Sequence, residues 1–498
     1  MESASFCPPA STSIYDRRRL SAAAAMLPDL WLKIPTWPSV GGGRRVIVIG
    51  AGISGLCAAW GLRAAGFSPV VLERTNRIGG RIFTLRDYFR GQYVELGATR
   101  IPEQHPLPLA YVRRFGLSYR EYPSNRTSPV YHVRGHRFET SGPHGAAYPR
   151  DLGLTDEEAR LDTEQLCNLY TERAMRVFSR PDEPGWPPAA AREAFHGESV
   201  QSLLGKLGAS PAAREIHRAC NGSVVETFDA LAWFAAQRVE GPGRKLYAIA
   251  GGNDRLTDSF AESLEGCIVR GAQVKAVRSA AGTVSVEYVR DGRRESIQGD
   301  YTLCTVPHRI LPEIDFSPPL SAAKRAAITA IPMGRVTRMN YQFSRRFWNR
   351  AGARGLVVAC TTSPIERLWD MSAIQPGTDG LLVAYAECLN AETLDRLPSD
   401  EARLERGLDV IESLFPGARA DFIKGLSFSW QQPWTQGAWP VLLADQAHLI
   451  GDLQRAEGRV FFAGDHTSIH SAWMQGALES AHFAIAEVIA AVRRTQSQ

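Results

Sequence analysis

The stretch RVIVIGAGISGLCAAWGLRAAGFSPVVLE, residues 45–73, determines the fold of this chain. A run of β-branched residues at 45–50 predicts a buried parallel strand, and the composition of 53–66 predicts a helix. A second short apolar run at 69–73 predicts another strand. Because strand, helix and strand follow one another directly, the sequence predicts a βαβ unit that begins a parallel sheet.

The glycines of this stretch follow the pattern of a phosphate-binding turn. Gly50, Gly52 and Gly55 have the spacing GxGxxG between the first strand and the helix. The first glycine permits the tight turn, the second lets a pyrophosphate approach the backbone, and the third allows close packing of the helix. The helix N-terminus adds free N–H groups and a partial positive charge. Glu73 ends the second strand near the distance expected for a ribose hydroxyl, so we predict a dinucleotide site.

The composition of the whole chain sets broad limits on its class. With 498 residues the chain exceeds one simple core, and 44% hydrophobic with 22% charged residues is ordinary for a globular protein. The net charge of +5 is small, which argues against nucleic acid as a main partner. No apolar stretch reaches the length of a membrane span. The eight cysteines form no CxxC pair and no Cys/His cluster, which favours a reduced, cytoplasmic protein without a structural zinc site.

The N-terminal residues 1–43 differ from the rest of the chain. The segment DRRRLSAAAAML (16–27) places a basic run before small apolar residues, as a signal peptide does. Pro28 and Asp29 end the apolar part too early for that role. We therefore expect a loosely ordered lead-in that packs on the protein surface.

Periodicity predicts further elements along the chain. Residues 151–220 favour helices, and Thr155 with Glu158 has the spacing of a capping box that would open the first of them. From about residue 240 alternating apolar and polar residues predict strands, including 336–343 and 380–387. A strand that runs into a loop at 459–465 and a long helix at 472–492 end the chain.

Several sequence blocks resemble those of the flavin amine oxidase superfamily. The resemblance is carried by ERTNRIGGR (73–81), GGNDRL (251–256), TVP with FSPPL (305–320), RRFW (345–348), and VFFAGDHTS with AWMQGALES (460–480). These blocks follow in family order from about residue 44 to the C-terminus. The resemblance implies an α/β fold, in which a Rossmann-like FAD-binding domain is joined to a mixed-sheet substrate domain and a helical insertion, as in FAD folds of the amine-oxidase and glutathione-reductase type.

On this resemblance we expect three domains after the lead-in. The FAD-binding domain takes residues 44–82, 244–315 and 456–498. The substrate-binding domain takes 83–145 and 316–455, and the helical domain takes 146–243.

The resemblance also implies how FAD is bound. In relatives such as the monoamine oxidases a cysteine four residues past a tryptophan carries the flavin covalently; here Trp434 stands in that place after Trp430, so we expect non-covalent FAD. Asp465, where the family usually has Glu, is expected to bond the sugar-like chain of the flavin, and the helix after Ala472 to point its N-terminus at the ring, which is anionic when reduced. The expected FAD contacts are Gly50, Gly52, Ile53, Ser54, Gly55, Glu73, Arg74, Gly80, Arg81, Gly97, Ala98, Thr99, Arg100, Val274, Trp430, Gly464, Asp465, Ala472, Trp473 and Met474.

The segment VELGATRIPEQH (94–105) carries an arginine into an apolar region. A guanidinium is always charged and is rarely buried without a partner. The segment is similar to the L-G-x-x-R-x-P-E-x-H pattern of L-amino-acid oxidases, whereas amine oxidases typically have an aromatic residue at the arginine position. The resemblance implies that Arg100 forms a bidentate salt bridge with the α-carboxylate of the substrate. The alternative is a structural ion pair with Glu103 or Glu95.

Three other residues are implied to act beside Arg100. Tyr385 matches a family tyrosine whose hydroxyl bonds the same carboxylate, and Trp473 matches the aromatic wall beside the flavin; either could instead be a core residue. Arg338 is a departure, because the family usually has a lysine there that holds a water near the flavin and is tied to the oxygen reaction. A base role for His196, His217 or His308 is less favoured than a structural or surface role.

Together these features predict an FAD-dependent L-amino-acid oxidase. The α-hydrogen would leave as hydride to the flavin, the imino acid would hydrolyse to a keto acid and ammonia, and oxygen would be reduced to hydrogen peroxide. Aromatic residues such as Trp369 lean toward a large apolar or aromatic substrate, and we expect a homodimer. The alternatives are an amino-acid 2-monooxygenase, which releases an amide and carbon dioxide, an amine or polyamine oxidase, and a flavin-bearing binding protein without turnover.

Overall fold

A computed structural model describes residues 33–123, 129–139, 148–177, 188–240, 245–280, 282–351 and 356–496. Most of the predicted lead-in, including residues 16–27, lies outside the described residues. Its described end packs on the protein, because Trp37 is buried and its ring meets His482 edge-on with 5.9 Å between ring centroids.

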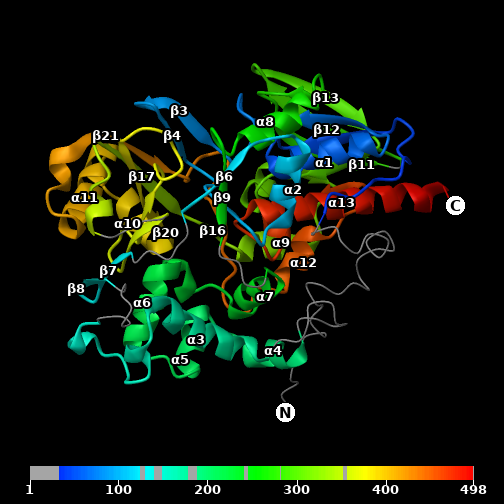
Figure 1. Ribbon diagram of the computed structural model, residues 1–498. Helices are drawn as coiled ribbons and strands as arrows, with labels where there is room; N and C mark the ends of the chain where they lie inside the picture. The colour runs from blue at the N-terminus through cyan, green and yellow to red at the C-terminus, as the bar shows by residue number, and fades with distance from the viewer. Residues whose placement is uncertain are drawn as a thin grey trace, which may run out of the picture.

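The described residues form a five-stranded parallel sheet that contains the predicted βαβ unit (Figure 1). Strand β1 (Arg45–Ile49) pairs in parallel with β2 (Ser68–Leu72), and α1 (Ile53–Ala64) connects them. The strand order is β10-β2-β1-β14-β23, with distant segments supplying β10 (Ile268–Val269), β14 (Tyr301–Cys304) and β23 (Val460–Phe462). The segment 459–465 forms a strand that runs into a loop, as predicted, and its paired residues are those of β23.

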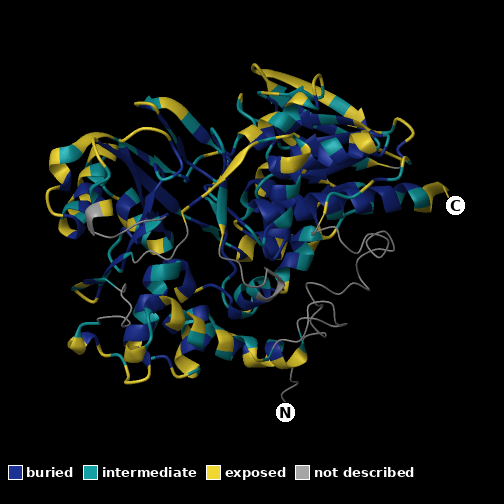
Figure 2. Ribbon diagram, in the orientation of Figure 1, coloured by how far each residue is buried: buried dark blue, intermediate teal, exposed yellow. Residues whose placement is uncertain are grey.

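Both faces of this sheet are covered, which explains its continuous apolar strands. Val46 and Val48 face a core shared with α1 and the terminal helix α13 (Met474–Gln496), and both helices are buried along most of their length (Figure 2). Ile47 and Ile49 face a four-stranded sheet. That sheet consists of β11 (Gln273–Ala280), β12 (Thr283–Arg290), β13 (Arg293–Gly299) and β15 (Asp315–Ser317).

A seven-stranded sheet forms the second large layer, in the order β21-β17-β20-β19-β18-β7-β8. Its central strands β17 (Val336–Phe343) and β20 (Gly380–Glu387) have the predicted limits. Side chains alternate between the two faces of a strand, so one face packs apolar residues on α10 (Cys388–Asp395) and α11 (Asp400–Leu414), and the other is turned to the molecule's interior. The remaining strands are β7 (Val130–Val133), β8 (His136–Glu139), β18 (Val357–Thr361), β19 (Arg367–Asp370) and β21 (Phe422–Ser429).

The predicted helical segment lies below both sheets in Figure 1. It consists of α3 (Thr163–Met175), α4 (Ala189–Ala194), α5 (Val200–Lys206), α6 (Pro211–Asn221) and α7 (Ala230–Glu240). Thr155 and Glu158 do bond reciprocally, but they close a 3₁₀ turn, and α3 begins only after Asp162, which caps it. A second capping box, of Asp162 with Gln165, starts α3, while the carboxylate of Glu158 also accepts from the Tyr170 hydroxyl at 2.6 Å and from the Ser210 N–H at 2.9 Å.

Shorter elements complete the described chain. They are α2 (Pro106–Arg114), α8 (Arg255–Glu262), α9 (Ala322–Ala330), α12 (Leu449–Gln454), β3 (Thr84–Phe89), β4 (Gln92–Glu95), β5 (Ile101–Pro102), β6 (Tyr119–Glu121), β9 (Leu246–Ile249), β16 (Met333–Gly334) and β22 (Trp439–Pro440). Among the described helices, none is both long and apolar enough to cross a membrane. The domain limits and the homodimer stay predictions.

The third glycine of the turn is required by close packing. A Cβ atom on Gly55 would lie 2.0 Å from the Gly50 carbonyl oxygen, a backbone atom that cannot move aside. We expect Gly55→Ala to destabilise the protein by about 3 kcal/mol. Gly451 in α12 meets no atom within 4 Å, so Gly451→Ala should stabilise slightly, by roughly 0.5–1 kcal/mol. Thermal unfolding of the two variants checks this, and equal melting temperatures would contradict it.

Candidate active site

A cavity between the two large sheets and the helical segment gathers the predicted site residues. Every member of the expected FAD set except Gly55 lines it, and so do Tyr385 and Arg338. Gly55 lies behind the wall, against Gly50 and Thr305. The residues expected to act together thus lie in one place, although their individual roles stay predictions.

The end of the cavity at α1 fits a pyrophosphate. Gly50 has a φ of +105°, in the region that favours glycine, and a Cβ on Gly52 would meet no atom closer than the Gly80 Cα at 3.9 Å. No side chain of the described residues caps the N-terminus of α1, so its first N–H groups are left for a ligand. Glu73 holds the turn from behind, because its carboxylate accepts from the Ala51 N–H at 2.8 Å.

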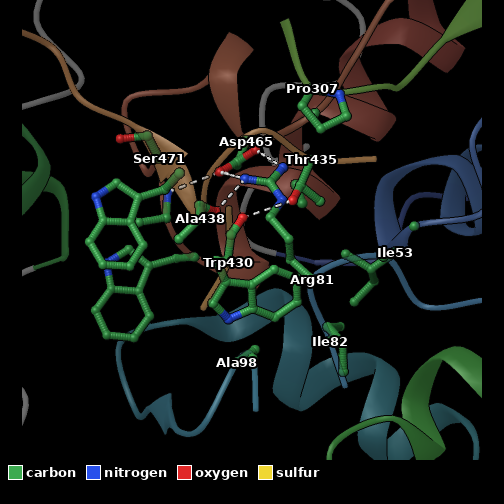
Figure 3. A pocket seen from close by; sticks show the side chains of 18 of the residues that line it. Ile53, Arg81, Ile82, Ala98, Pro307, Trp430, Thr435, Ala438, Asp465 and Ser471 are labelled. Carbon is green, nitrogen blue, oxygen red and sulfur yellow. Dashed lines mark hydrogen bonds and ion pairs between the residues drawn. The ribbon is translucent and has the colours of Figure 1, made fainter. Parts of the chain in front are cut away.

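An ion pair between the half-buried Arg81 and the buried Asp465 joins three distant segments at the cavity wall (Figure 3). Arg81 donates to both carboxylate oxygens of Asp465, at 2.5 and 2.9 Å, and to the Ala438 carbonyl at 2.8 Å. Burial alone would raise the pKa of Asp465, but the charge and hydrogen bonds of Arg81 outweigh it and hold that pKa below its usual value. The Ala472 N–H also donates to Asp465 at 3.2 Å, and Ala472 has a φ of +70°, a conformation that costs a residue with a side chain about 1 kcal/mol.

The segment before Arg100 is held against this wall by backbone contacts. A Cβ on Gly97 would lie 1.9 Å from the Arg81 carbonyl oxygen, so the neighbour that this glycine accommodates is the chain itself. The Trp430 indole N–H donates to the Leu96 carbonyl at 2.7 Å. Arg338 donates to the Glu95 carbonyl at 2.9 Å and to the Thr99 hydroxyl at 2.7 Å, which ties the segment to β17.

Arg100 is half-buried and its guanidinium lies between two indoles. The guanidinium carbon is 4.9 Å from the Trp369 ring centroid and 5.2 Å from that of Trp473. No carboxylate of the described residues forms an ion pair with it, and Glu95 is instead bonded to Thr84. Burial, and then the charge of Arg367, lowers the pKa of Arg100 to about 10. The arrangement leaves a cation in the cavity with its hydrogen-bond donors available to an anionic ligand.

The interior face of the seven-stranded sheet supplies the opposite wall. Arg338, Tyr385 and Arg367 are cross-strand neighbours on β17, β20 and β19. The Tyr385 ring stacks on Trp369 with 4.5 Å between centroids and lies parallel to Trp439 at 6.5 Å. The two guanidinium carbons lie 5.3 and 5.0 Å from the Tyr385 ring centroid, so two cations flank one tyrosine.

The sequence did not predict an ion pair between Arg367 and Glu387. Both residues line the cavity. Arg367 donates to Glu387 across 3.1 Å. Burial would lower the pKa of Arg367, but the carboxylates of Glu387 and Glu366 raise it. A signal for both residues was present: Arg367 stands two positions before Trp369, and Glu387 two positions after Tyr385, so each pair shares a strand face. The helical wall, with Cys220, Asn221, Phe228 and Trp233, carried no comparable signal.

The three histidines considered as bases lie elsewhere in the described structure. His196 is exposed and pairs with Asp445 at 3.0 Å. His217 and His308 are buried, and burial lowers the pKa of each to about 4. His470 lines the cavity instead, with its Nδ1 2.8 Å from Glu479.

Comparison with known proteins identifies the family. The model of the flavin containing amine oxidoreductases matches residues 53–489, and the chain belongs to this family. An L-amino-acid oxidase of Siganus canaliculatus is 27% identical over 456 residues, covering 89% of this chain and 85% of that protein. The flavin-dependent L-tryptophan oxidase RebO of Lentzea aerocolonigenes is 26% identical over 490 residues, covering 89% and 98%. A structure of putrescine oxidase bound to putrescine superposes with a TM-score of 0.75 at 22% identity, covering 90% and 99%.

These comparisons confirm the predicted fold and FAD as the cofactor, and define the protein as a flavin-dependent oxidoreductase. The residues present fit that cofactor. The open space at Gly52 and the uncapped end of α1 suit the pyrophosphate, and Glu73 stands at the adjoining edge of the sheet.

The cofactor site can be tested at Gly52. Its backbone angles suit alanine and the added methyl group meets only ordinary contacts, so Gly52→Ala should fold normally. The methyl group would occupy space at the pyrophosphate end, and we expect FAD affinity to fall at least tenfold, about 1.4 kcal/mol. FAD content after gel filtration measures this, with Gly451→Ala as the control. Full FAD retention by Gly52→Ala would contradict the placement.

Glu95 predicts a pH dependence of stability. Its buried carboxylate accepts from the Asn253 N–H and the Thr84 hydroxyl, each at 2.8 Å, yet burial raises its pKa to about 8. The folded protein therefore binds this proton more tightly than the unfolded chain, whose Glu titrates near pH ~4.3. The stabilisation is present at low pH and is lost as pH rises through about 8. When the pH is raised from about 5 to about 9, the melting temperature should fall less for Glu95→Gln than for the wild type. Equal falls in the two proteins would contradict this.

Proposed function

We propose that this protein is an FAD-dependent L-amino-acid oxidase, which converts an L-amino acid and oxygen to the imino acid, then keto acid and ammonia, with hydrogen peroxide. One observation carries the proposal: the guanidinium of Arg100 lines the cavity between two indoles, without a carboxylate partner among the described residues. Among the substrates of this family, amino acids have a carboxylate at the reacting carbon and simple amines do not. The names of the relatives support the same substrate class.

Arg100 binds and orients the substrate in this proposal. Its planar fork matches the two oxygens of the α-carboxylate, and the flanking rings of Trp369 and Trp473 restrict where the fork can move. The Tyr385 hydroxyl donates to the same carboxylate. Two fixed contacts on the carboxylate orient the α-hydrogen, which is the contribution that positioning makes to rate. FAD supplies the hydride acceptor when bound.

The remaining walls favour a large apolar or aromatic side chain. Trp369, Tyr385 and Trp439 form a row of stacked rings along one wall, and Phe228 and Trp233 line the helical side. Apolar surfaces of this kind exclude water from the reacting centre, which strengthens the electrostatic contacts inside.

Arg338 gives the cavity a fixed positive charge. Its side chain is buried and held by Glu95 and Thr99, and a guanidinium does not release its proton near neutral pH. Arg338 therefore stabilises negative charge near the ring without exchanging protons, and we propose that it alters the oxygen reaction relative to a lysine. We propose further that FAD is held without a covalent bond, with Trp434 packed edge-on against Trp430 at 5.6 Å.

The role of Arg100 is tested by Arg100→Met, which removes the charge and keeps much of the volume. Loss of a buried charged contact of about 3–4 kcal/mol should lower kcat/KM for an L-amino acid by roughly 10²–10³. Activity toward the matching amine without a carboxylate should not fall. Arg345→Met is the matched control, because Arg345 is exposed and pairs with Asp421 at 2.7 Å far from these walls.

Product analysis separates the alternatives. Peroxide and keto acid from a screen of L-amino acids support the proposal, whereas amide and carbon dioxide indicate a 2-monooxygenase. Full activity in Arg100→Met would indicate an amine oxidase. A flavin that no L-amino acid bleaches without oxygen would indicate a binding protein.

A further inference from the structure

Three thiols meet where the helical segment contacts the seven-stranded sheet. Cys220 lies near the end of α6, Cys167 on α3 and Cys360 on β18. Cys360 is the register partner of Tyr131 on β7, and the Cys220 thiol donates to the Tyr131 hydroxyl across 3.9 Å. Helix α6, which carries Cys220, packs against both α3 and β18, which carry the other two thiols. The described cysteines are free, so this cluster is reduced.

The three thiols differ in access. Cys220 lines the proposed active-site cavity together with Asn221, whereas Cys167 and Cys360 are outside its wall and pack in the core behind it. A small molecule in the cavity can therefore reach Cys220, and the other two sulfurs stand on the protein side of it.

The surroundings of Cys220 favour its reactive form. The neighbouring thiols of Cys167 and Cys360 hold the pKa of the Cys220 thiol below its usual range against the opposing effect of burial. By contrast, burial raises the pKa of Cys304 to about 12. The thiolate is the nucleophile of cysteine chemistry, so Cys220 combines access with activation.

We propose that Cys220 is a peroxide-reactive site, which hydrogen peroxide oxidises to a sulfenic acid and which Cys167 or Cys360 then closes to a disulfide. The Cys220 sulfur attacks one peroxide oxygen, the S–O bond forms as the O–O bond breaks, and the second oxygen leaves as water after taking a proton. The neighbouring sulfur then displaces the hydroxyl group, which leaves as a second water. The thiol pair loses two electrons and peroxide gains them. This inference rests on the proposed function only in that the oxidase activity supplies the hydrogen peroxide.

Closure would alter the cavity wall. The chain after Cys220 turns at Gly222, where a Cβ would lie 1.8 Å from a Glu387 oxygen. Ser223 donates to the Glu366 carboxylate and to the Glu387 carbonyl, each at 3.1 Å. Because this turn is seated so closely on the strand that carries Glu387, pulling the Cys220 sulfur toward a new bond displaces the wall. The product of turnover would thereby slow its own formation.

The test treats the FAD-loaded wild-type protein with hydrogen peroxide and no amino acid. Intact mass should show loss of two hydrogens, and peptide mapping after alkylation should locate the bond at Cys220. Activity should fall and return with dithiothreitol. Cys220→Ser should keep its activity after peroxide treatment, when compared with the same variant before treatment. Cys267→Ser removes a partly buried thiol outside the cavity and should lose activity as the wild type does. Replacing the resolving cysteine with alanine should leave a sulfenic acid that dimedone traps.

Two outcomes separate the thiol chemistry from the proposed function. If added peroxide leaves Cys220 reduced while other thiols are oxidised, the inference is overturned whatever the enzyme's substrate. If added peroxide forms the disulfide but no L-amino acid yields peroxide, the reactive site stands and the proposed function fails. Disulfide formation during turnover that catalase prevents would support both.

Discussion

The ion pair between Arg81 and the buried Asp465 is the contact on which the cavity depends. It joins the loop after the first βαβ unit to the segment that leads into the terminal helix. Arg81 also donates a hydrogen bond to the Ala438 carbonyl. Asp465 is buried, and a buried charge without its partner is strongly destabilising, so separating the two segments is energetically unfavourable. The same loop presents the Arg81 carbonyl against which Gly97 packs. One arginine thus positions both this wall of the cavity and the start of the segment that carries Arg100.

Four of the arginines that line the cavity differ in the partners that balance their charge. Arg81 and Arg367 each have a carboxylate, at Asp465 and Glu387, and Arg338 is held by uncharged oxygens. Arg100 has no carboxylate partner among the described residues, and its guanidinium lies beside two indole rings. Aromatic faces attract a cation without neutralising it, so its charge remains available to a ligand. This difference distinguishes a guanidinium that builds the wall from one suited to bind a carboxylate.

The helical segment has a second role besides closing the cavity. Its α6 helix brings Cys220 to the cavity wall and, through the turn at Gly222, meets the strand that carries Tyr385 and Glu387. Cavity walls, a charged pair and a thiol cluster therefore share one contact between helix and sheet. A small change on either side is transmitted because close-packed interiors do not absorb displacements.

Local patterns in the sequence determined the βαβ unit, the glycine turn, the limits of β17 and β20 and the membership of the chain in a flavin family, because periodicity and glycine geometry act over a few residues. Thr155 and Glu158 bond as their spacing predicts, but they close a 3₁₀ turn whose Glu158 carboxylate also binds distant Tyr170 and Ser210, and the helix begins only after Asp162. The tertiary structure alone decided that the neighbour of Gly97 is Arg81, that Arg367 pairs with Glu387, and that Cys220 joins two other thiols. Each of these depends on which distant segments lie side by side, and strand register and helix packing set that only when the whole chain has folded.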